Sequence, residues 1–462
     1  MGVRIESGLQ NWQIVQQRDG AAEFRLAGSF AAGEGVSRFR VLARVVREDS
    51  GEPVTGWEEA ETAGRAGGWR VALTVPAGGL YRVETCLNQD NGPVEWSQRG
   101  DMIHHVGAGQ SNSAGYGRDA ILDAPEIGVH LLRNNGKWDL ASHPLGDSTG
   151  TIHPVNAAAS NTAHSPHLHF GKYLKRALGH PIGLLQTALG GTPLERWNPK
   201  EKGDLYANMV EIIKSTGYGI RGVLWYQGCS DTNSQGESQS YYRRFMELVD
   251  GLRADIKEPE LPFITVQLNR WLSSKDGSDV DPLWGAMREA QRQAGRRPGV
   301  WVVPSTDCRL TDGIHNSAAS NLVLGERMAK AALGGIYGKK SAYLAPDAIG
   351  AQRTGATQIE LAFGNILGRI ETYGLAGRHS PFSVEDETGP NPVRSYAASG
   401  RDRIVIDTER EIRGACRVHG AYEANPAVFV PYDTGSYLPM LAFYDLDVQS
   451  DEGIAGTGCA SF

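Results

Sequence analysis

Cysteine, long apolar runs and excess positive charge are all scarce in this chain of 462 residues. The five cysteines are Cys86, Cys229, Cys308, Cys416 and Cys459. Their odd number, wide spacing and lack of a CxxC pair argue against a disulfide framework and against a zinc site. Lys and Arg total 46 against 53 for Asp and Glu, and the net charge of −7 disfavours binding to nucleic acid or to an anionic membrane surface.

No run of about 18 apolar residues is present, so no membrane-spanning helix is predicted. The first twenty residues hold no apolar stretch behind a basic start, which predicts no secretory signal. We therefore expect a cytoplasmic protein, with a trimmed secreted form as the alternative. The composition, 40% hydrophobic and 21% charged, is that of an ordinary globular protein.

The texture of the sequence changes twice, which predicts three domains. Residues 1–100 alternate apolar and polar residues between Gly-rich turns and predict a β-sandwich-like N-terminal domain. Residues 101–340 alternate short apolar runs with helical patterns, which predicts an α/β catalytic domain with a parallel sheet and helices on both faces. Residues 341–462 again show the apolar runs and alternation typical of strands. The two β-rich segments are expected to form either one or two sandwich domains.

Four polar or Gly-rich loops each follow a predicted strand of the central region. They contain Gly109-Gln110-Ser111-Asn112, Gly190-Gly191-Thr192, Gln227-Gly228-Cys229 and Asp312-Gly313-Ile314-His315. Because ligands of parallel sheets bind beyond the carboxyl ends of the strands, these loops are expected to meet at one edge.

These loops hold the groups that acyl transfer requires. A serine hydroxyl needs a base to take its proton, and that base is usually a histidine oriented by a carboxylate. Ser111, His315 and Asp312 supply this set. An oxyanion needs preorganised donors. The backbone N–H groups of Ser111 and of Gly190 or Gly191, with the side-chain amide of Gln227, are the predicted donors.

The blocks GQSN, GGTPLERW, WYQG and DGIH resemble those of the sialate O-acetylesterase-like family of SGNH hydrolases. That resemblance implies a flavodoxin-like α/β core and a serine esterase that removes O-acetyl groups from sugars through an acetyl-enzyme. It implies Ser111 as nucleophile, Asp312 and His315 as its partners, and Gly190 or Gly191 with Gln227 at the oxyanion. No cofactor or metal is expected, and the partner is an acetylated carbohydrate. The sugar, the regioselectivity and the oligomeric state stay open.

Several further residues are assigned to substrate binding. Gln110 and Asn112 flank the nucleophile, and Trp197 and Trp271 are expected to form the pocket wall, because aromatic faces stack on sugar rings. Arg270, with Arg196 as the other candidate, could recognise a carboxylate such as that of sialic acid.

The chain departs from the family pattern at two positions. Cys229 stands where members often carry an acidic residue, and the nearby Asp231 either compensates or is unrelated. Ser113 replaces a larger Met, which is expected to open the pocket beside the nucleophile. These departures bear on the substrate more than on the reaction.

A histidine cluster and a cysteine carry groups that could bind a metal or act as a nucleophile. His164, His167 and His169 could bind a metal, but helical spacing turns His169 away from the other two, so surface and helix-start roles are favoured. Cys229 as nucleophile lacks a base other than the one that Ser111 needs. Two alternative functions remain: an inactive carbohydrate-binding protein on an esterase core, and a serine hydrolase for other short-chain esters.

Overall fold

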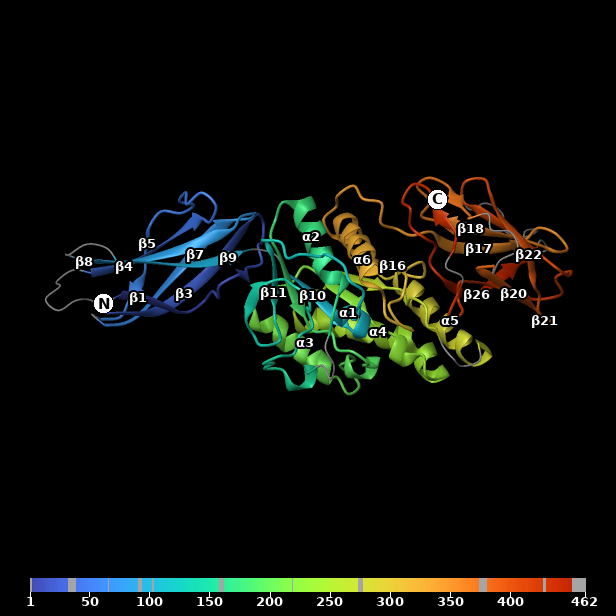
Figure 1. Ribbon diagram of the computed structural model, residues 1–462, viewed down its shortest axis with the longest axis horizontal. Coiled ribbons are helices and arrows are strands. Elements are labelled where there is room, and N and C mark those ends of the chain that lie inside the picture. Colours follow the sequence, from blue (N-terminus) through green and yellow to red (C-terminus); the bar gives the residue numbers. More distant parts are fainter. Residues whose placement is uncertain are drawn as a thin grey trace.

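The computed structural model describes residues 2–31, 39–64, 66–89, 94–101, 104–157, 162–217, 219–272, 277–373, 380–426 and 429–450. Cys459 lies outside these ranges, and the other four cysteines are free thiols. Within the described ranges, no helix is both long enough and apolar enough to cross a membrane. The chain forms an N-terminal β unit, a central α/β unit and a C-terminal β unit, which follow one another along the long axis (Figure 1).

The N-terminal unit consists of two sheets that share one hydrophobic core. One sheet contains, in spatial order, β1 (Gly2–Ser7), β3 (Ala21–Ala31), β7 (Ala66–Pro76) and β6 (Glu61–Thr62). The other contains β2 (Gln13–Ile14), β9 (Val94–Asp101), β8 (Tyr81–Gln89), β4 (Phe39–Arg47) and β5 (Glu58–Glu59). Burial alternates along β3, because successive side chains of a strand point to opposite faces.

The central unit is built on a seven-stranded sheet, parallel except for β12 at its edge. The spatial order is β12 (Trp138–Leu140), β11 (Val129–Leu132), β13 (Ile182–Gln186), β10 (His104–Gly109), β14 (Val223–Tyr226), β15 (Phe263–Val266) and β16 (Val300–Val303). The first strand in sequence, β10, lies between β13 and β14. The connections therefore diverge from β10, and its carboxyl end is the switch point where ligands bind in such sheets.

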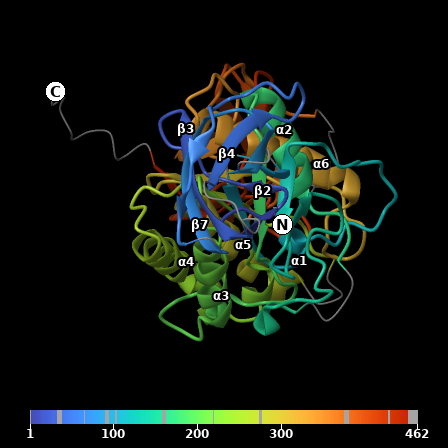
Figure 2. The same cartoon turned by 90° about the vertical axis from the view of Figure 1, so that its left-hand side faces the viewer.

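Helices cover both faces of this sheet. α2 (Pro166–Leu178) packs beside α6 (Ala318–Ala331), while α3 (Asp204–Ser215), α4 (Gln235–Asp255) and α5 (Gly277–Ala294) pack on the other face (Figure 2). α2 begins as its sequence predicts, with Ser165 accepting a hydrogen bond from the N–H of His167 and Pro166 in the first turn. The predicted parallel α/β core between two β-rich segments is confirmed.

The C-terminal unit holds an eight-stranded sheet with its own core. Its order is β21 (Gly389–Pro390), β20 (Phe382–Asp386), β24 (Cys416–Gly420), β26 (Phe443–Gln449), β17 (Asp347–Arg353), β18 (Gln358–Gly364), β23 (Arg403–Thr408) and β22 (Val393–Ser399). A small sheet pairs β19 (Ile370–Glu371) with β25 (Tyr432–Asp433). The N- and C-terminal strands lie at opposite ends of the molecule (Figure 1), so they form separate sheets with separate cores.

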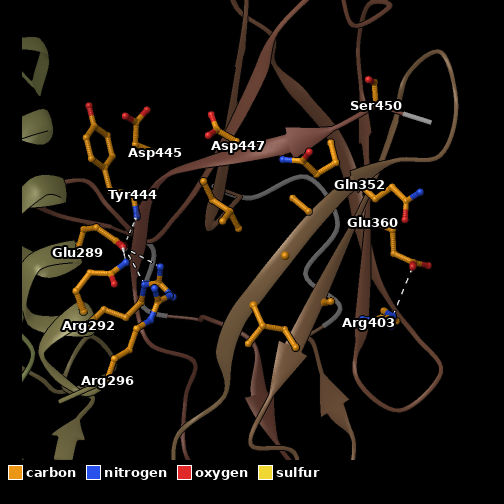
Figure 3. Close-up of a pocket in the computed structure, with 17 residues that line it drawn as sticks. Glu289, Arg292, Arg296, Gln352, Glu360, Arg403, Tyr444, Asp445, Asp447 and Ser450 are labelled. Carbon is orange, nitrogen blue, oxygen red and sulfur yellow. Dashed lines mark hydrogen bonds and ion pairs between the residues drawn. The ribbon is translucent and has the colours of Figure 1, made fainter. Parts of the chain in front are cut away.

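Polar contacts join α5 to the C-terminal sheet beside a cleft of about 720 Å³. Arg292 is 3% exposed and donates to Asp347 at 2.7 Å and to the carbonyl of Ala348. Glu289 accepts from Arg292 and from the N–H of Tyr444 (Figure 3). These contacts connect α5 to the first residues of β17 and β26.

A buried arginine of the same helix links the C-terminal unit to the central sheet. The guanidinium of Arg288 donates to the carbonyls of Leu268 and Asn269, which follow β15, at 2.9 and 2.7 Å. It also donates to carbonyls of the 421–424 segment, including that of Tyr422 at 2.9 Å. Burial lowers its pKa to about 10, so the group stays charged at neutral pH.

We expect Arg288→Met to lower the free energy of unfolding by about 3 kcal/mol or more, because it leaves several buried carbonyls without a donor. Arg297→Met is the matched control, since the ion pair of Arg297 with Asp250 is about half exposed and contributes about 0.5 kcal/mol or less. Urea unfolding followed by tryptophan fluorescence measures both. Equal losses for the two variants would contradict a structural role for Arg288.

Candidate active site

The four loops meet around a pocket of about 400 Å³ at the carboxyl ends of β10, β13 and β14. Its lining consists of Gln110, Ser111, Tyr116, Gly190, Gly191, Cys229, Ser230, Thr232, Asn233, Trp271, Trp284, Ile314 and His315. The pocket therefore lies at the switch point of the sheet, and it brings Ser111, His315 and the glycine pair together.

Ser111 lies at a sharp change from strand to helix. β10 ends at Gly109, whose φ is +123°, and a Cβ there would lie 2.4 Å from the carbonyl oxygen of Tyr226. Only glycine permits this close approach. Ser111 is the first residue of the short helix α1 (Ser111–Ala114), so its N–H has no acceptor within that helix. Ser111 itself lines the pocket, at the start of this helix.

His315 and Asp312 form a tight pair within one loop. The Nδ1 of His315 lies 2.7 Å from Oδ2 of Asp312, and Oδ1 accepts the backbone N–H groups of Ile314 and His315 at 2.9 and 2.8 Å. Partial burial raises the pKa of Asp312, but these hydrogen bonds outweigh it and hold the pKa below its usual value. The ionised carboxylate fixes the Nδ1–H tautomer, which leaves Nε2 of His315 able to accept a proton.

Sequence reasoning missed Tyr116. Its ring stacks on the imidazole of His315 with 4.8 Å between centroids and 21° between planes. The only sequence signal for it is the pair of glycines at 115 and 117 on either side.

The structure corrects the substrate-binding role assigned to Asn112. Its side chain is 4% exposed and does not line the pocket. Its Nδ2 donates to the carbonyl of Ile314 at 3.2 Å, and its Oδ1 accepts the N–H of Asn316 at 2.8 Å. Asn112 therefore bonds the backbone on both sides of His315 and joins the nucleophile loop to the histidine loop.

Gln110 does line the pocket, as expected of a substrate-binding residue. Its Oε1 accepts the N–H groups of Gly228 and Ser230 at 3.1 and 3.3 Å. Its carbonyl oxygen therefore ties the first loop to the third, and its contact with substrate stays a prediction.

The structure also corrects the oxyanion role assigned to Gln227. Its side chain is fully buried, and its Nε2 donates both hydrogens, to Asp231 at 2.5 Å and to the carbonyl of Thr192 at 3.1 Å. Its Oε1 accepts from the hydroxyl of Tyr241. With its donors occupied below the pocket, this amide cannot reach an oxyanion beside Ser111.

Asp231 is the acidic residue nearest to position 229. Its buried carboxylate accepts from Gln227, from the N–H of Leu194 at 3.0 Å and from Arg244 at 3.1 Å. Burial raises its pKa against the opposing effect of these donors. Asp231 thus joins the second loop to the third from inside the protein, while Cys229 faces the pocket.

Gly190 and Gly191 both line the pocket, as predicted. Gly191 has a φ of +69°, and a Cβ on Gly190 would lie 2.8 Å from the hydroxyl of Tyr116. Side chains are therefore disfavoured at both positions, and the backbone N–H groups stay accessible to a ligand.

The aromatic wall differs from the prediction. Trp197 is fully buried, donates to Thr192 at 3.1 Å and packs edge-on against Trp225, so it belongs to the core. Trp271 does line the pocket, stacked on Trp284 at 5.9 Å. Trp284, which sequence reasoning missed, lies on a helix that gave no pocket signal.

The two arginines considered for carboxylate recognition, Arg270 and Arg196, bond groups of the protein itself. Arg270 donates to the carbonyl of Cys308 at 3.2 Å and does not line the pocket, which corrects its assignment to substrate binding. Burial lowers its pKa. Arg196 forms a bidentate pair with Asp204 at 2.7 and 3.0 Å, so its fork is occupied.

Two smaller expectations are settled by burial. Ser113 is fully buried and donates to the carbonyl of Ala108 at 2.7 Å, so its small size does not widen the pocket. Burial raises the pKa of the Cys229 thiol to about 12, which disfavours a thiolate nucleophile.

The histidine cluster is divided between two places. His167 is buried beneath β10, while His164 and His143 both contact Oδ2 of Asp123, at 3.1 and 3.0 Å. The ammonium of Lys172 contacts the other oxygen of Asp123 at 2.6 Å. Lys172 thus supplies a cation for this carboxylate, and His167 and His169 do not join His164 there.

This arrangement suits nucleophilic acyl transfer. A hydroxyl lies at a helix start, a histidine is oriented by a carboxylate, and a glycine pair exposes backbone donors. The aromatic pair on one side and hydroxyl and amide side chains on the other offer contacts for a sugar-sized ligand.

Comparisons with known proteins point the same way. Residues 104–334 match the model of a family described as carbohydrate esterase, sialic acid-specific acetylesterase. A probable carbohydrate esterase of Arabidopsis thaliana is 30% identical over 250 residues, which are 49% of this chain and 88% of that protein. The sialate O-acetylesterase of Homo sapiens is 29% identical over 141 residues, 24% of this chain and only 27% of that protein.

Among solved structures, a carbohydrate acetylesterase from Xanthomonas citri superposes with a TM-score of 0.66 at 20% identity. The match covers 95% of this chain and 99% of that one, so the two share their fold along almost their whole length.

We expect Asn112→Ala to lower kcat/KM on an aryl acetate by about 10²-fold, because small displacements of catalytic groups have effects of that size. Asn391→Ala is the matched control. Asn391 is equally buried and bonds the backbone of Arg410 in the C-terminal unit. A control variant that loses as much activity as Asn112→Ala would show that general destabilisation explains both.

Proposed function

The chain belongs to the carbohydrate esterase family of sialic acid-specific acetylesterases and is a carbohydrate acetylesterase, and from this premise we propose that Ser111 carries the reaction. The observation behind the proposal is a single pocket that contains Ser111, His315 with its 2.7 Å contact to Asp312, and the Gly190–Gly191 pair.

In the proposed mechanism, the hydroxyl of Ser111 attacks the acetyl carbonyl while Nε2 of His315 takes its proton. The N–H of Ser111 and an N–H of the glycine pair stabilise the oxyanion. The C–O bond to the sugar then breaks, and His315 returns the proton to the leaving hydroxyl. Water, deprotonated by His315, attacks the acetyl-enzyme, and acetate leaves as Ser111 recovers its proton. Asp312 holds the tautomer of His315 throughout and stabilises its protonated form.

We expect the purified protein to release acetate from acetylated sugars and to be labelled by a fluorophosphonate, and we expect Ser111→Ala to abolish both. Loss of the nucleophile typically costs 10⁴-fold or more in kcat. An active Ser111→Ala variant would refute the mechanism. A wild-type protein that binds glycans but releases no acetate and takes no label would favour the inactive binding protein. Rates that rise with acyl length on aryl esters would favour the other short-chain hydrolase.

We further propose that the preferred sugar is neutral. The described side chains that line the pocket are aromatic, hydroxyl, amide, thiol and aliphatic groups beside His315, and none of these residues is a lysine or an arginine. The ionised Asp312 contacts Nδ1 of that histidine. A carboxylate brought into this pocket would lose water without gaining a cation, and it would approach a like charge.

We expect kcat/KM for an O-acetylated neutral hexose to exceed that for an O-acetylated sialic acid by at least about tenfold, the effect of roughly 1.4 kcal/mol. The methyl ester of the same sialic acid is the matched control, because it removes only the charge. Recovery of the rate with the ester supports charge exclusion. A faster reaction with the free acid would contradict it.

A further inference from the structure

Tyr116 is held on both sides by glycines packed against two helix starts. Gly117 exchanges backbone hydrogen bonds with His164, just before α2, at 3.1 and 3.2 Å. A Cβ on Gly117 would lie 2.9 Å from the N–H nitrogen of Ala318, at the start of α6, and a Cβ on Gly115 would lie 2.9 Å from the carbonyl carbon of His164. The backbone at Tyr116 therefore has little room to move.

The side chain of Tyr116 reaches from this fixed backbone to His315. Its ring covers one face of the imidazole at 4.8 Å and 21°, while Asp312 holds the Nδ1 edge. The hydroxyl lies next to Gly190. The imidazole is thus fixed in plane by the carboxylate and in tilt by the ring, with Nε2 left for proton transfer.

The positive charge that develops on His315 during the reaction lies against the ring of Tyr116. The imidazole becomes a cation when it accepts the proton of Ser111, and an aromatic face attracts a cation electrostatically. The titratable groups around it are Asp312 on its own loop, Tyr116 after α1 and Cys229 after β14, where the thiol is neutral.

We propose that Tyr116 is a positioning residue for His315: its ring fixes the tilt of the imidazole and lies against the cation that the reaction creates. This inference rests on the proposed function of Ser111 and His315. It assigns the effect to the face of the ring and not to the hydroxyl.

The experiment compares Tyr116→Phe with Tyr116→Leu on an aryl acetate, which needs no contact with sugar. Phe keeps the ring face, and we expect it to stay within about threefold of the wild-type kcat. Leu keeps apolar bulk without the ring, and we expect kcat to fall about tenfold with little change in KM. Because Phe keeps the ring face and Leu does not, a kcat that is retained in the Phe variant and lost in the Leu variant at an unchanged KM separates the effect of the ring from a general loss of structure.

Equal kcat values for the Phe and Leu variants would overturn the inference, whether both match wild type or both fall. Thermal unfolding checks that both variants fold, and Tyr116→Met serves as a second non-aromatic variant if the Leu protein does not. Ser111→Ala is measured in parallel. Full activity of Ser111→Ala would refute the proposed function itself, whereas an inactive Ser111→Ala with equal Phe and Leu variants would refute the role of Tyr116 alone.

Discussion

The geometry of the site depends on a pair of hydrogen bonds made by one buried side chain. Asn112 bonds the carbonyl of Ile314 and the N–H of Asn316, and so it joins loops that lie about 200 residues apart in the sequence. Each bond contributes about 1 kcal/mol net, but an unpaired buried amide would cost more. This asymmetry makes one arrangement of the loops strongly preferred, which matters because acyl transfer tolerates little displacement of the base.

Asp231 has the same effect on the other side of the pocket. A buried carboxylate is stable only when its oxygens are satisfied, and here Gln227, the N–H of Leu194 and Arg244 all donate to it. The second and third loops are therefore joined through a buried carboxylate that is not among the residues lining the pocket. Cys229, directly after Gln227-Gly228, lines the pocket, whereas the acidic residue nearest to it, Asp231, makes this internal contact.

The C-terminal unit supports the aromatic side of the pocket. Arg288 bonds carbonyls of both the 268–269 and the 421–424 segments, the N–H of Trp271 donates to the carbonyl of Ala424 at 2.7 Å, and the N–H of Ala424 donates to Asp281. Trp271 is thus held by a backbone contact to a region outside the α/β core, and the helix that carries Trp284 is held there through the side chains of Asp281 and Arg288. The aromatic side of the pocket therefore depends on contacts with the third unit, whereas Ser111, Asp312 and His315 all lie in the central unit.

The sequence was sufficient for features that depend on local order along the chain. The alternation of strands and helices predicted the parallel core, and loops that follow parallel strands had to meet at one edge, so Ser111, Gly190, Gly191 and His315 came together. Features that depend on the direction of a side chain were not predictable. Gln227 and Trp197 carry suitable groups at suitable positions, yet both point into the core, because Asp231 and Thr192 bind their polar atoms there.

Tyr116 shows what a pattern can still indicate. Glycine permits close approach of the backbone to its neighbours, and in this structure Gly115 and Gly117 pack tightly on both sides of Tyr116. The pattern Gly115-Tyr116-Gly117 thus indicates a place where an aromatic ring can be held a few residues after the nucleophile. It does not identify the residue that the ring contacts, because His315 lies far along the sequence and is brought there by long-range hydrogen bonds such as those of Asn112 and of Arg118 with Thr311. Close packing of Gly115 and Gly117 fixes the ring of Tyr116, and long-range hydrogen bonds fix the position of His315. The environment of the proposed catalytic base results from both.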